Sequence, residues 1–166
     1  MTREEVLDRL RTDRAGFDAR VAAIPSVAFE RPVPGGTHTP KQIVWHVVAY
    51  DRLVVDRLRA ARDGETTAFE RDRVGWEAFN ERTWAEGNAL GPETVRAAAV
   101  NVFAELLAEV RRLTDQELAG PVGISASIDP AWLDGRALWE LIGIDGFDHY
   151  RMHFGALDAA AQPREG

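Results

Sequence analysis

A long apolar stripe at helical spacing, between residues 39 and 64, most constrains the fold of this chain. Thr39, with Pro40 next and Gln42 three positions on, forms a capping box with proline at the first helical position. The pattern ends near Gly64, a residue that favours a helix end. Its inward positions recur every three or four residues: Ile43, His46, Val47, Tyr50, Leu53, Val54 and Leu58. A helix with such a face buries it, so other helices are expected to pack against it.

Three other long stretches share this periodicity. The first starts at a capping box at Thr2, the third opens at Pro92, and the last is expected to begin with Asp134 as N-cap and to run unbroken through residue 157. A shorter helical piece from Gly75 to Gly87 lies between the second and the third. No stretch alternates in the manner of a strand. The sequence therefore predicts an all-α four-helix bundle with a short inserted helix between helices 2 and 3.

Composition indicates a packed protein without a thiol of its own. With 166 residues, of which 45% are hydrophobic and 28% charged, the chain is expected to form a single domain over residues 1–160, with residues 161–166 as a flexible tail. The absence of cysteine excludes disulfides, zinc–thiolate sites and a cysteine nucleophile. If the chemistry needs a thiol, that thiol must arrive with a substrate or cofactor.

The charge balance limits the expected partners. The formal net charge is -7, from 27 acidic and 20 basic side chains, which argues against nucleic acid and anionic membranes because phosphate binding needs a basic face. No apolar run reaches the roughly 18 residues needed to span a bilayer. A small-molecule substrate, no nucleic-acid or membrane partner and a cytoplasmic location are therefore expected.

Three of the four histidines fall on inward faces of two predicted helices. His149 and His153 are four residues apart, so both imidazoles lie on one helical face, and His46 belongs to the stripe of the second helix. Together they predict a site for a divalent transition metal, Zn²⁺ or Ni²⁺ first, with coordination positions left open as in catalytic centres. The alternative is that each histidine is a hydrogen-bonded core residue. His38 lies in a loop and is left outside the site.

Two further residues are candidates for proton transfer. Asp145 lies one turn before His149, where its carboxylate could be a fourth ligand, a partner that orients an imidazole, or a general base. Tyr50 lies one turn beyond His46, where its hydroxyl could face the metal. A solvated aspartate at the lip of the helix and a tyrosine with a buried ring and a wet hydroxyl are the ordinary alternatives.

Five tryptophans are many for this length. Trp76, Asn80 and Trp84 belong to the inserted helix and could form a lid over an aromatic-walled substrate pocket, to which Trp139 would contribute from the start of the last helix. Simple filling of the core or of surface grooves is the alternative.

Short motifs in these helices resemble the DinB/YfiT-like superfamily of bacterial four-helix bundles. The matching features are His46 within PKQIVWHVVAYDRLVVDRL, and His149 and His153 within DHYRMH. Within that superfamily the chain most resembles the ClbS/DfsB branch, through the segment VGWEAFNERTW and through the GR-x-L-W pattern that opens the last helix at Gly135, Arg136, Leu138 and Trp139.

The resemblance implies a divalent metal held by the three histidines, and frequent dimers, so a homodimer is expected. It also implies thiol-dependent transferases and isomerases that use bacillithiol, mycothiol or glutathione. The ClbS branch implies self-protection by hydrolytic opening of an electrophilic natural product. Members of that branch can lack the metal histidines, whereas this chain keeps all three, which favours metal-assisted chemistry.

The sequence thus predicts a metal-dependent enzyme acting on a small electrophilic molecule, by hydrolysis or ring opening or by transfer of a low-molecular-weight thiol. Detoxification or self-resistance would be its role. Two alternatives remain open: a non-catalytic protein that sequesters a small molecule, as in the ClbS type, and a structural bundle whose histidines bind no metal.

Overall fold

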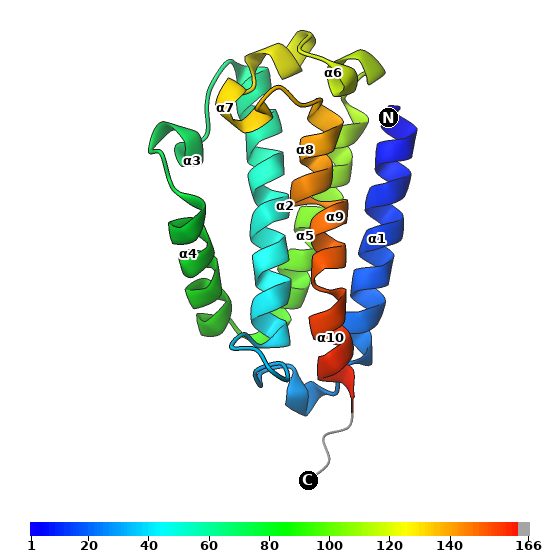
Figure 1. Cartoon of the computed structure of the whole chain (residues 1–166), viewed down its shortest axis with the longest axis vertical. Coiled ribbons are helices and arrows are strands. Elements are labelled where there is room, and N and C mark those ends of the chain that lie inside the picture. The colour runs from blue at the N-terminus through cyan, green and yellow to red at the C-terminus, as the bar shows by residue number, and fades with distance from the viewer. Residues whose placement is uncertain (163–166) are drawn as a thin grey trace.

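The computed structural model describes residues 1–162 and contains only helices within that range. Three long helices and a row of three shorter ones stand side by side (Figure 1). They are α1 (Arg3–Ala23), α2 (Pro40–Asp63), α5 (Pro92–Arg111) and the row α8 (Leu138–Asp145), α9 (Phe147–Met152) and α10 (Phe154–Ala161). The predicted all-α bundle is confirmed. The predicted tail, residues 161–166, lies mostly outside the described residues, and α10 ends at Ala161.

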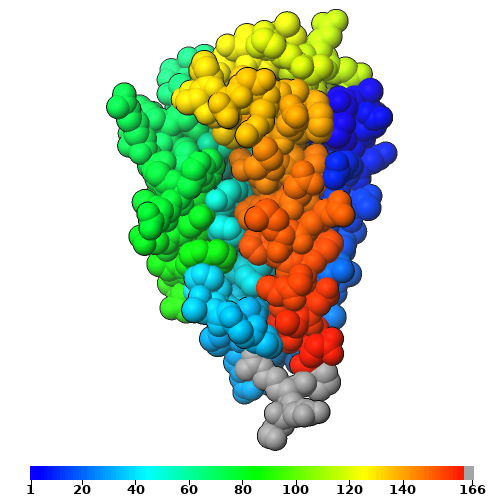
Figure 2. All heavy atoms as spheres, in the orientation of Figure 1, coloured from blue at the N-terminus to red at the C-terminus, as the bar shows by residue number. Residues whose placement is uncertain are grey.

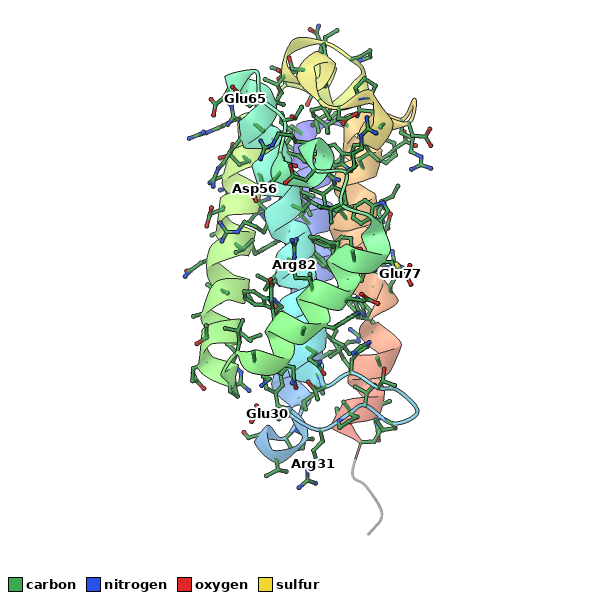
Figure 3. All side chains as sticks on the ribbon, turned by 90° about the vertical axis from the view of Figure 1, so that its left-hand side faces the viewer. Glu30, Arg31, Asp56, Glu65, Glu77 and Arg82 are labelled. Atoms are coloured by element: carbon green, nitrogen blue, oxygen red, sulfur yellow. The ribbon has the colours of Figure 1, made fainter. Side chains whose placement is uncertain are left out.

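The segment between α2 and α5 holds two helices instead of the one predicted. They are α3 (Ala68–Arg71) and α4 (Trp76–Ala89). Figure 1 shows both along one side of α2, and Figure 3 shows α4 crossing in front of α2 with Glu77 and Arg82 on its exposed face. The connections carry η1 (Ser26–Ala28), α6 (Asp115–Ala119), η2 (Gly123–Ser127) and α7 (Pro130–Leu133).

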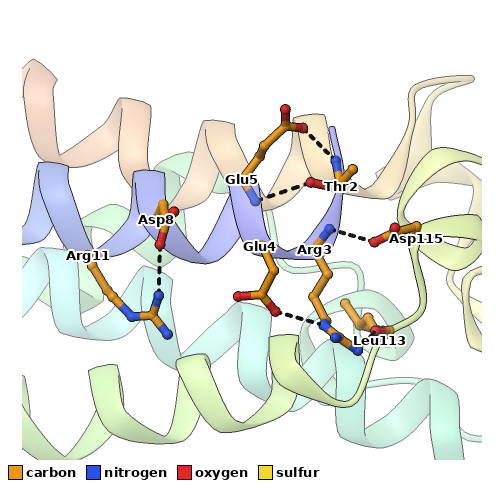
Figure 4. A network of polar contacts seen from close by, with 8 residues as sticks. All are labelled: Thr2, Arg3, Glu4, Glu5, Asp8, Arg11, Leu113 and Asp115. Atoms are coloured by element: carbon orange, nitrogen blue, oxygen red, sulfur yellow. Dashed lines mark hydrogen bonds and ion pairs between the residues drawn. The ribbon is translucent and has the colours of Figure 1, made fainter.

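Threonine capping boxes start three of the helices. Thr2 Oγ1 accepts from the amide of Glu5 at 3.3 Å, and the Glu5 carboxylate accepts from the amide of Thr2 at 2.8 Å (Figure 4). The same reciprocal bonds occur at Thr39 before α2 and at Thr114 before α6. The amide of Arg3 also donates to Asp115 at 2.7 Å, which ties the start of α1 to α6. Each such cap stabilises its helix by about 1 kcal/mol.

The last predicted helix differs from the structure in its start and in its continuity. Asp134 is not an N-cap: it has a left-handed backbone, with φ of 48°, at the end of α7, and α8 begins after Ala137. The helical row is interrupted at Gly146, with φ of -113° and ψ of -103°. A Cβ at Gly146 would lie 2.6 Å from the carbonyl oxygen of Ile142, so this sharp break admits only glycine. Helical periodicity alone does not register such a break, because the apolar pattern continues on both sides of it.

A charged network lies in the middle of the core. Asp51 of α2 is fully buried, and its carboxylate accepts from Arg14 of α1 at 2.9 Å and from the Tyr150 hydroxyl of α9 at 2.6 Å. Arg14 also donates to the carbonyl of Ala99 on α5 at 2.8 Å. Burial raises the pKa of Asp51, an effect that Arg14 and Tyr150 oppose. The network joins α1, α2, α5 and α9, the helices that enclose the core.

None of the helices in residues 1–162 is both long enough and apolar enough to cross a membrane.

The buried network predicts an asymmetry between its two charged members. Asp51→Asn should lower the free energy of unfolding by about 3–5 kcal/mol, because it leaves the buried Arg14 guanidinium, which cannot lose its proton, with only the exposed carboxylate of Asp18 as counter-charge. Arg14→Met should cost less, since the buried Asp51 carboxyl can take up a proton. In that variant the folded state keeps a proton that the unfolded state releases, so stability should fall as the pH rises above about 4.

Urea unfolding of both variants at pH 5 and pH 8, with unchanged m-values, measures these effects. Equal losses for the two substitutions, or no pH dependence of Arg14→Met, would contradict the assignment.

Candidate functional site

Three imidazoles converge between α2 and the last helical row. His46 lies on α2, His149 on α9, and His153 at the junction of α9 and α10. The Nε2 atom of His149 is 3.2 Å from Nε2 of His46 and 3.1 Å from Nε2 of His153. Within the described residues this is the one cluster of metal-ligating side chains that has three members, and its ligand atoms all lie within 4.8 Å of one another.

The spacing of these nitrogens fits one shared cation. Nitrogen ligands about 2.0–2.1 Å from an ion at tetrahedral angles are about 3.4 Å apart, close to the two separations observed around His149. In the absence of an ion, the single proton that His149 Nε2 can carry could serve only one of its two nitrogen neighbours.

Thr83 sets the orientation of His46. The Thr83 hydroxyl of α4 donates to the carbonyl of Asn80 at 2.9 Å, so its oxygen is left to accept from Nδ1 of His46 at 3.2 Å. With its proton on Nδ1, neutral His46 directs the lone pair of Nε2 toward the other two histidines. A fixed tautomer of this kind is what a metal-binding histidine requires.

All three histidines are held in the neutral form. Burial, the largest cause in each case, lowers the pKa of His46 to about 2, of His149 to about 3 and of His153 to about 4. Mutual repulsion of the imidazolium forms lowers the pKa of His46 and His149 further. Neutral imidazoles with inward lone pairs suit a transition-metal ion.

Aromatic rings cover the cluster on the side of α4. The Trp84 ring stacks on His46 with centroids 4.0 Å apart and planes 17° apart, and it stacks on His38 at 4.0 Å and 12°. Two rings at that distance from one indole centroid occupy its opposite faces, so Trp84 separates His38 from His46. His38, expected to lie outside the site, is thus not a member of the histidine cluster. It packs against the far face of Trp84, the ring that covers His46.

Tyr50 links the cluster to the inserted helix. Its ring lies edge-on to His149, with centroids 4.3 Å apart, and its hydroxyl donates to the side-chain oxygen of Asn80 at 2.9 Å. Burial, with the nearby Asp145 charge, raises the pKa of Tyr50. The phenol therefore stays protonated at neutral pH and acts as a hydrogen-bond donor.

Asp145 is bound to a buried arginine and lies outside the histidine cluster. Its Oδ2 accepts from Nη1 of Arg57 at 3.0 Å, and Nε of Arg57 donates to Glu70 of α3 at 2.6 Å. Burial raises the pKa of Asp145 to about 6, because it outweighs the opposing effect of Arg57 and of a hydrogen bond from Trp132. A carboxyl with such a pKa can exchange a proton near neutral pH.

Arg57 and Thr83 were not singled out from the sequence. A signal for Arg57 exists: it follows His46 by eleven residues and Tyr50 by seven, so it lies on the same helical stripe. Thr83 offers no comparable signal, since a threonine on a short amphipathic helix has many ordinary roles.

A cavity of about 790 Å³ opens beside the histidines. Its walls come from α2 (Tyr50 and Arg57) and from the insert, the segment with α3 and α4 between α2 and α5 (Phe69 and Trp76). Residues 129–152, which include Trp132, Asp145 and His149, form the rest of the wall. In Figure 2 a strip of α2 is visible between the insert and the last helical row.

Only one of the four residues predicted for the pocket lines the cavity. Trp76 lines the cavity, whereas Asn80 and Trp84 contact Tyr50 and His46 from α4. Trp139 is half-buried against the core and is not among the lining residues. Trp132, which was not predicted to line the pocket, forms part of its wall, with the Arg57 guanidinium 4.2 Å above its ring.

Comparison with known proteins identifies the family and the fold. Residues 9–153 match the DinB superfamily. The colibactin self-resistance protein ClbS, solved in complex with dsDNA, has a TM-score of 0.80 at 14% identity, and the match covers 99% of this chain and 98% of that one. A protein from Streptococcus pneumoniae has a TM-score of 0.79 at 13% identity, with 95% and 88% covered. No curated protein sequence matches this chain.

An enzyme of known activity shares the fold over part of the enzyme's own length. The mycothiol-dependent maleylpyruvate isomerase has a TM-score of 0.69 at 20% identity. The match covers 96% of this chain but only 62% of the isomerase. At these identities the structural matches establish the fold alone.

The exclusion of nucleic acid as a partner has to be corrected. ClbS, which shares this fold, was crystallised with double-stranded DNA. The exclusion rested on a net charge of -7. A net charge averages over the whole surface and does not describe the local field at one face, so it cannot exclude this class of partner.

The lowered histidine pKa values predict acid sensitivity of the metal-free protein. Between about pH 6.5 and pH 4 the unfolded chain binds protons at His46, His149 and His153 that the folded chain does not bind, so the free energy of unfolding should fall as the pH falls. Urea titrations in EDTA at several pH values measure the slope. A variant with glutamine at all three positions should show a shallower slope, and equal slopes would contradict the assignment.

Proposed function

The chain belongs to the DinB superfamily, and on that premise we propose that it is a metal-dependent enzyme acting on a small electrophilic molecule. His46, His149 and His153 would hold one divalent transition-metal ion. The observation that carries the proposal is the convergence of three neutral imidazole nitrogens, from buried His46 and His149 and partly buried His153, within 4.8 Å of one another, beside a cavity that His149 lines. Zn²⁺ and Ni²⁺ suit three imidazole ligands.

When bound, such an ion supplies Lewis acidity, which polarises a substrate oxygen and favours the deprotonated form of a nucleophile. The chain's own groups then divide the remaining work. Tyr50 stays protonated, and because its hydroxyl donates to Asn80, its oxygen is left to accept a hydrogen bond in the cavity, while Asp145, with a pKa of about 6, accepts or returns a proton there. Thr83 keeps His46 in one tautomer.

The nucleophile is proposed to be water or a low-molecular-weight thiol. Water would give hydrolysis or ring opening, with detoxification or self-resistance as the role. The chain has no cysteine, so a thiol would have to enter as a cosubstrate. The mycothiol-dependent maleylpyruvate isomerase supports the thiol route by its fold, and ClbS supports the role in self-resistance.

A second candidate is a non-catalytic protein that sequesters a small molecule. The cavity of about 790 Å³ with aromatic walls favours it, since this size is typical of sites for drug-sized ligands. Incubation with an electrophile separates the two candidates: an enzyme converts many equivalents, whereas a sequestering protein releases one equivalent unchanged on denaturation.

Metal content tests the first proposal. Protein purified without chelators or a histidine tag should contain nearly one equivalent of a divalent transition metal by elemental analysis, and His149→Ala should contain none. His38→Ala is the matched control, because it also removes an imidazole but lies outside the cluster. Metal-free wild type whose melting temperature Zn²⁺ and Ni²⁺ do not raise, or metal retained by His149→Ala, would reject the metal centre.

Thr83 provides a subtler test. Thr83→Val should weaken metal affinity by about 10-fold or more, because Nδ1 of His46 loses its acceptor and the tautomer is no longer fixed. Thr83→Ser keeps the hydroxyl and should bind metal as the wild type does. Competition with a chromogenic chelator measures both affinities, and equal weakening by the two substitutions would assign Thr83 to packing instead.

A further inference from the structure

We infer that Arg73 contacts the substrate, and that the substrate is a largely apolar, aromatic molecule with an anionic group that Arg73 binds at the mouth of the cavity. The inference rests on the proposed function, because it specifies which class of small molecule the cavity beside the histidines takes. Three features of the cavity carry it: its charges, the backbone at Arg73 and its walls.

Most charged groups of the cavity wall already have a partner. The carboxylates of Glu70 and Asp145 are both bonded to the buried guanidinium of Arg57. The carboxylate of Asp129 accepts from the amide of Ala131 at 2.7 Å and so caps α7. These groups have little capacity left to bind a charged ligand.

The exposed end of the wall carries the remaining charges. Arg136 lies 3.8 Å from the carboxylate of Asp134. The side chain of Arg73 makes no hydrogen bond, ion pair or ring contact within residues 1–162, although it lines the same cavity. Arg73 is thus the cation of the wall whose charge is free for a ligand.

The backbone at Arg73 has a conformation that usually belongs to glycine. The amide of Arg73 donates to the carbonyl of Glu70 and the amide of Val74 to that of Phe69, the paired bonds of a Schellman motif. Its central residue, Arg73, has φ of 51°. The equivalent motif at the end of α2 uses Gly64, with φ of 73°.

An arginine is therefore held where glycine would be less strained. Residues kept in such conformations concentrate at ligand-binding sites, where the position of the side chain outweighs the conformational cost.

The walls determine what the rest of the ligand has to be. Trp76 stacks on Tyr50 with centroids 5.7 Å apart and packs against Phe69 at 4.8 Å, and Trp132 lines the cavity beyond Arg57. Planar apolar surface is what such walls bury best. A guanidinium binds carboxylate, sulfonate or phosphate groups through its fork of N–H donors. Since His149 lines the same cavity, a molecule held by Arg73 lies beside the histidine cluster.

Two fluorescent probes that differ by one charge test the inference. Anilinonaphthalene sulfonate has two aromatic ring systems and a sulfonate, and phenylnaphthylamine has the same rings without the sulfonate. Arg73→Gly should weaken binding of the sulfonate probe at least tenfold and leave the neutral probe within twofold. The same substitution should raise the melting temperature, because glycine relieves the left-handed backbone.

Two control variants locate the effect. Arg71→Ala removes an exposed arginine of α3 that pairs with Asp72 and does not line the cavity, and it should change neither affinity. Trp76→Ala removes part of the aromatic wall and should weaken both probes alike. The inference is overturned if the wild type does not bind the sulfonate probe, if Arg73→Gly affects the two probes equally, or if Trp76→Ala affects neither.

These measurements need no turnover and are made on protein as purified and after treatment with EDTA. A protein without metal or activity that still discriminates the probes through Arg73 would refute the proposed enzyme and leave the anion site standing. An active metalloprotein that does not discriminate between the probes would support the proposed enzyme and refute the anion site at Arg73.

Discussion

Asp51 is the buried carboxylate on which the arrangement of the helices depends. It accepts hydrogen bonds from Arg14 of α1 and from Tyr150 of α9, at 2.9 Å and 2.6 Å. A buried charge without partners is strongly unfavourable, so the packing that brings these groups together is favoured over neighbouring registers. Asp51 shares α2 with His46, and Tyr150 directly follows His149. The interaction that sets the register of the bundle therefore also sets the distance between the histidines.

Arg57 has a comparable position nearer the cavity. Its guanidinium joins α2 to Glu70 of the insert and to Asp145 at the end of α8, and it covers the ring of Trp132. Removing it would leave two carboxylates without a counter-charge beneath the insert. The cavity wall and the stability of the insert thus rest on the same buried ion pairs, which ties any change in the pocket to a change in packing.

Much of the fold could be predicted from local patterns, because helix starts and apolar faces are properties of a few neighbouring residues. The predicted capping boxes at Thr2 and Thr39 both form. The break at Gly146 was missed, since an apolar period does not reveal a local change in backbone direction. The exclusion of nucleic acid was wrong because a net charge carries no information about where charges lie.

The sequence by itself determined that the chain is helical and which face of each helix is inward, and this places His46, His149 and His153 in the interior. Helical periodicity fixes a direction around one axis, but it does not fix how far one helix slides or rotates against another. Only the tertiary structure decided that three Nε2 atoms meet, that Thr83 orients His46 and that Asp145 binds Arg57. Each of these contacts joins segments far apart in the sequence, and its length depends on packing across the whole bundle.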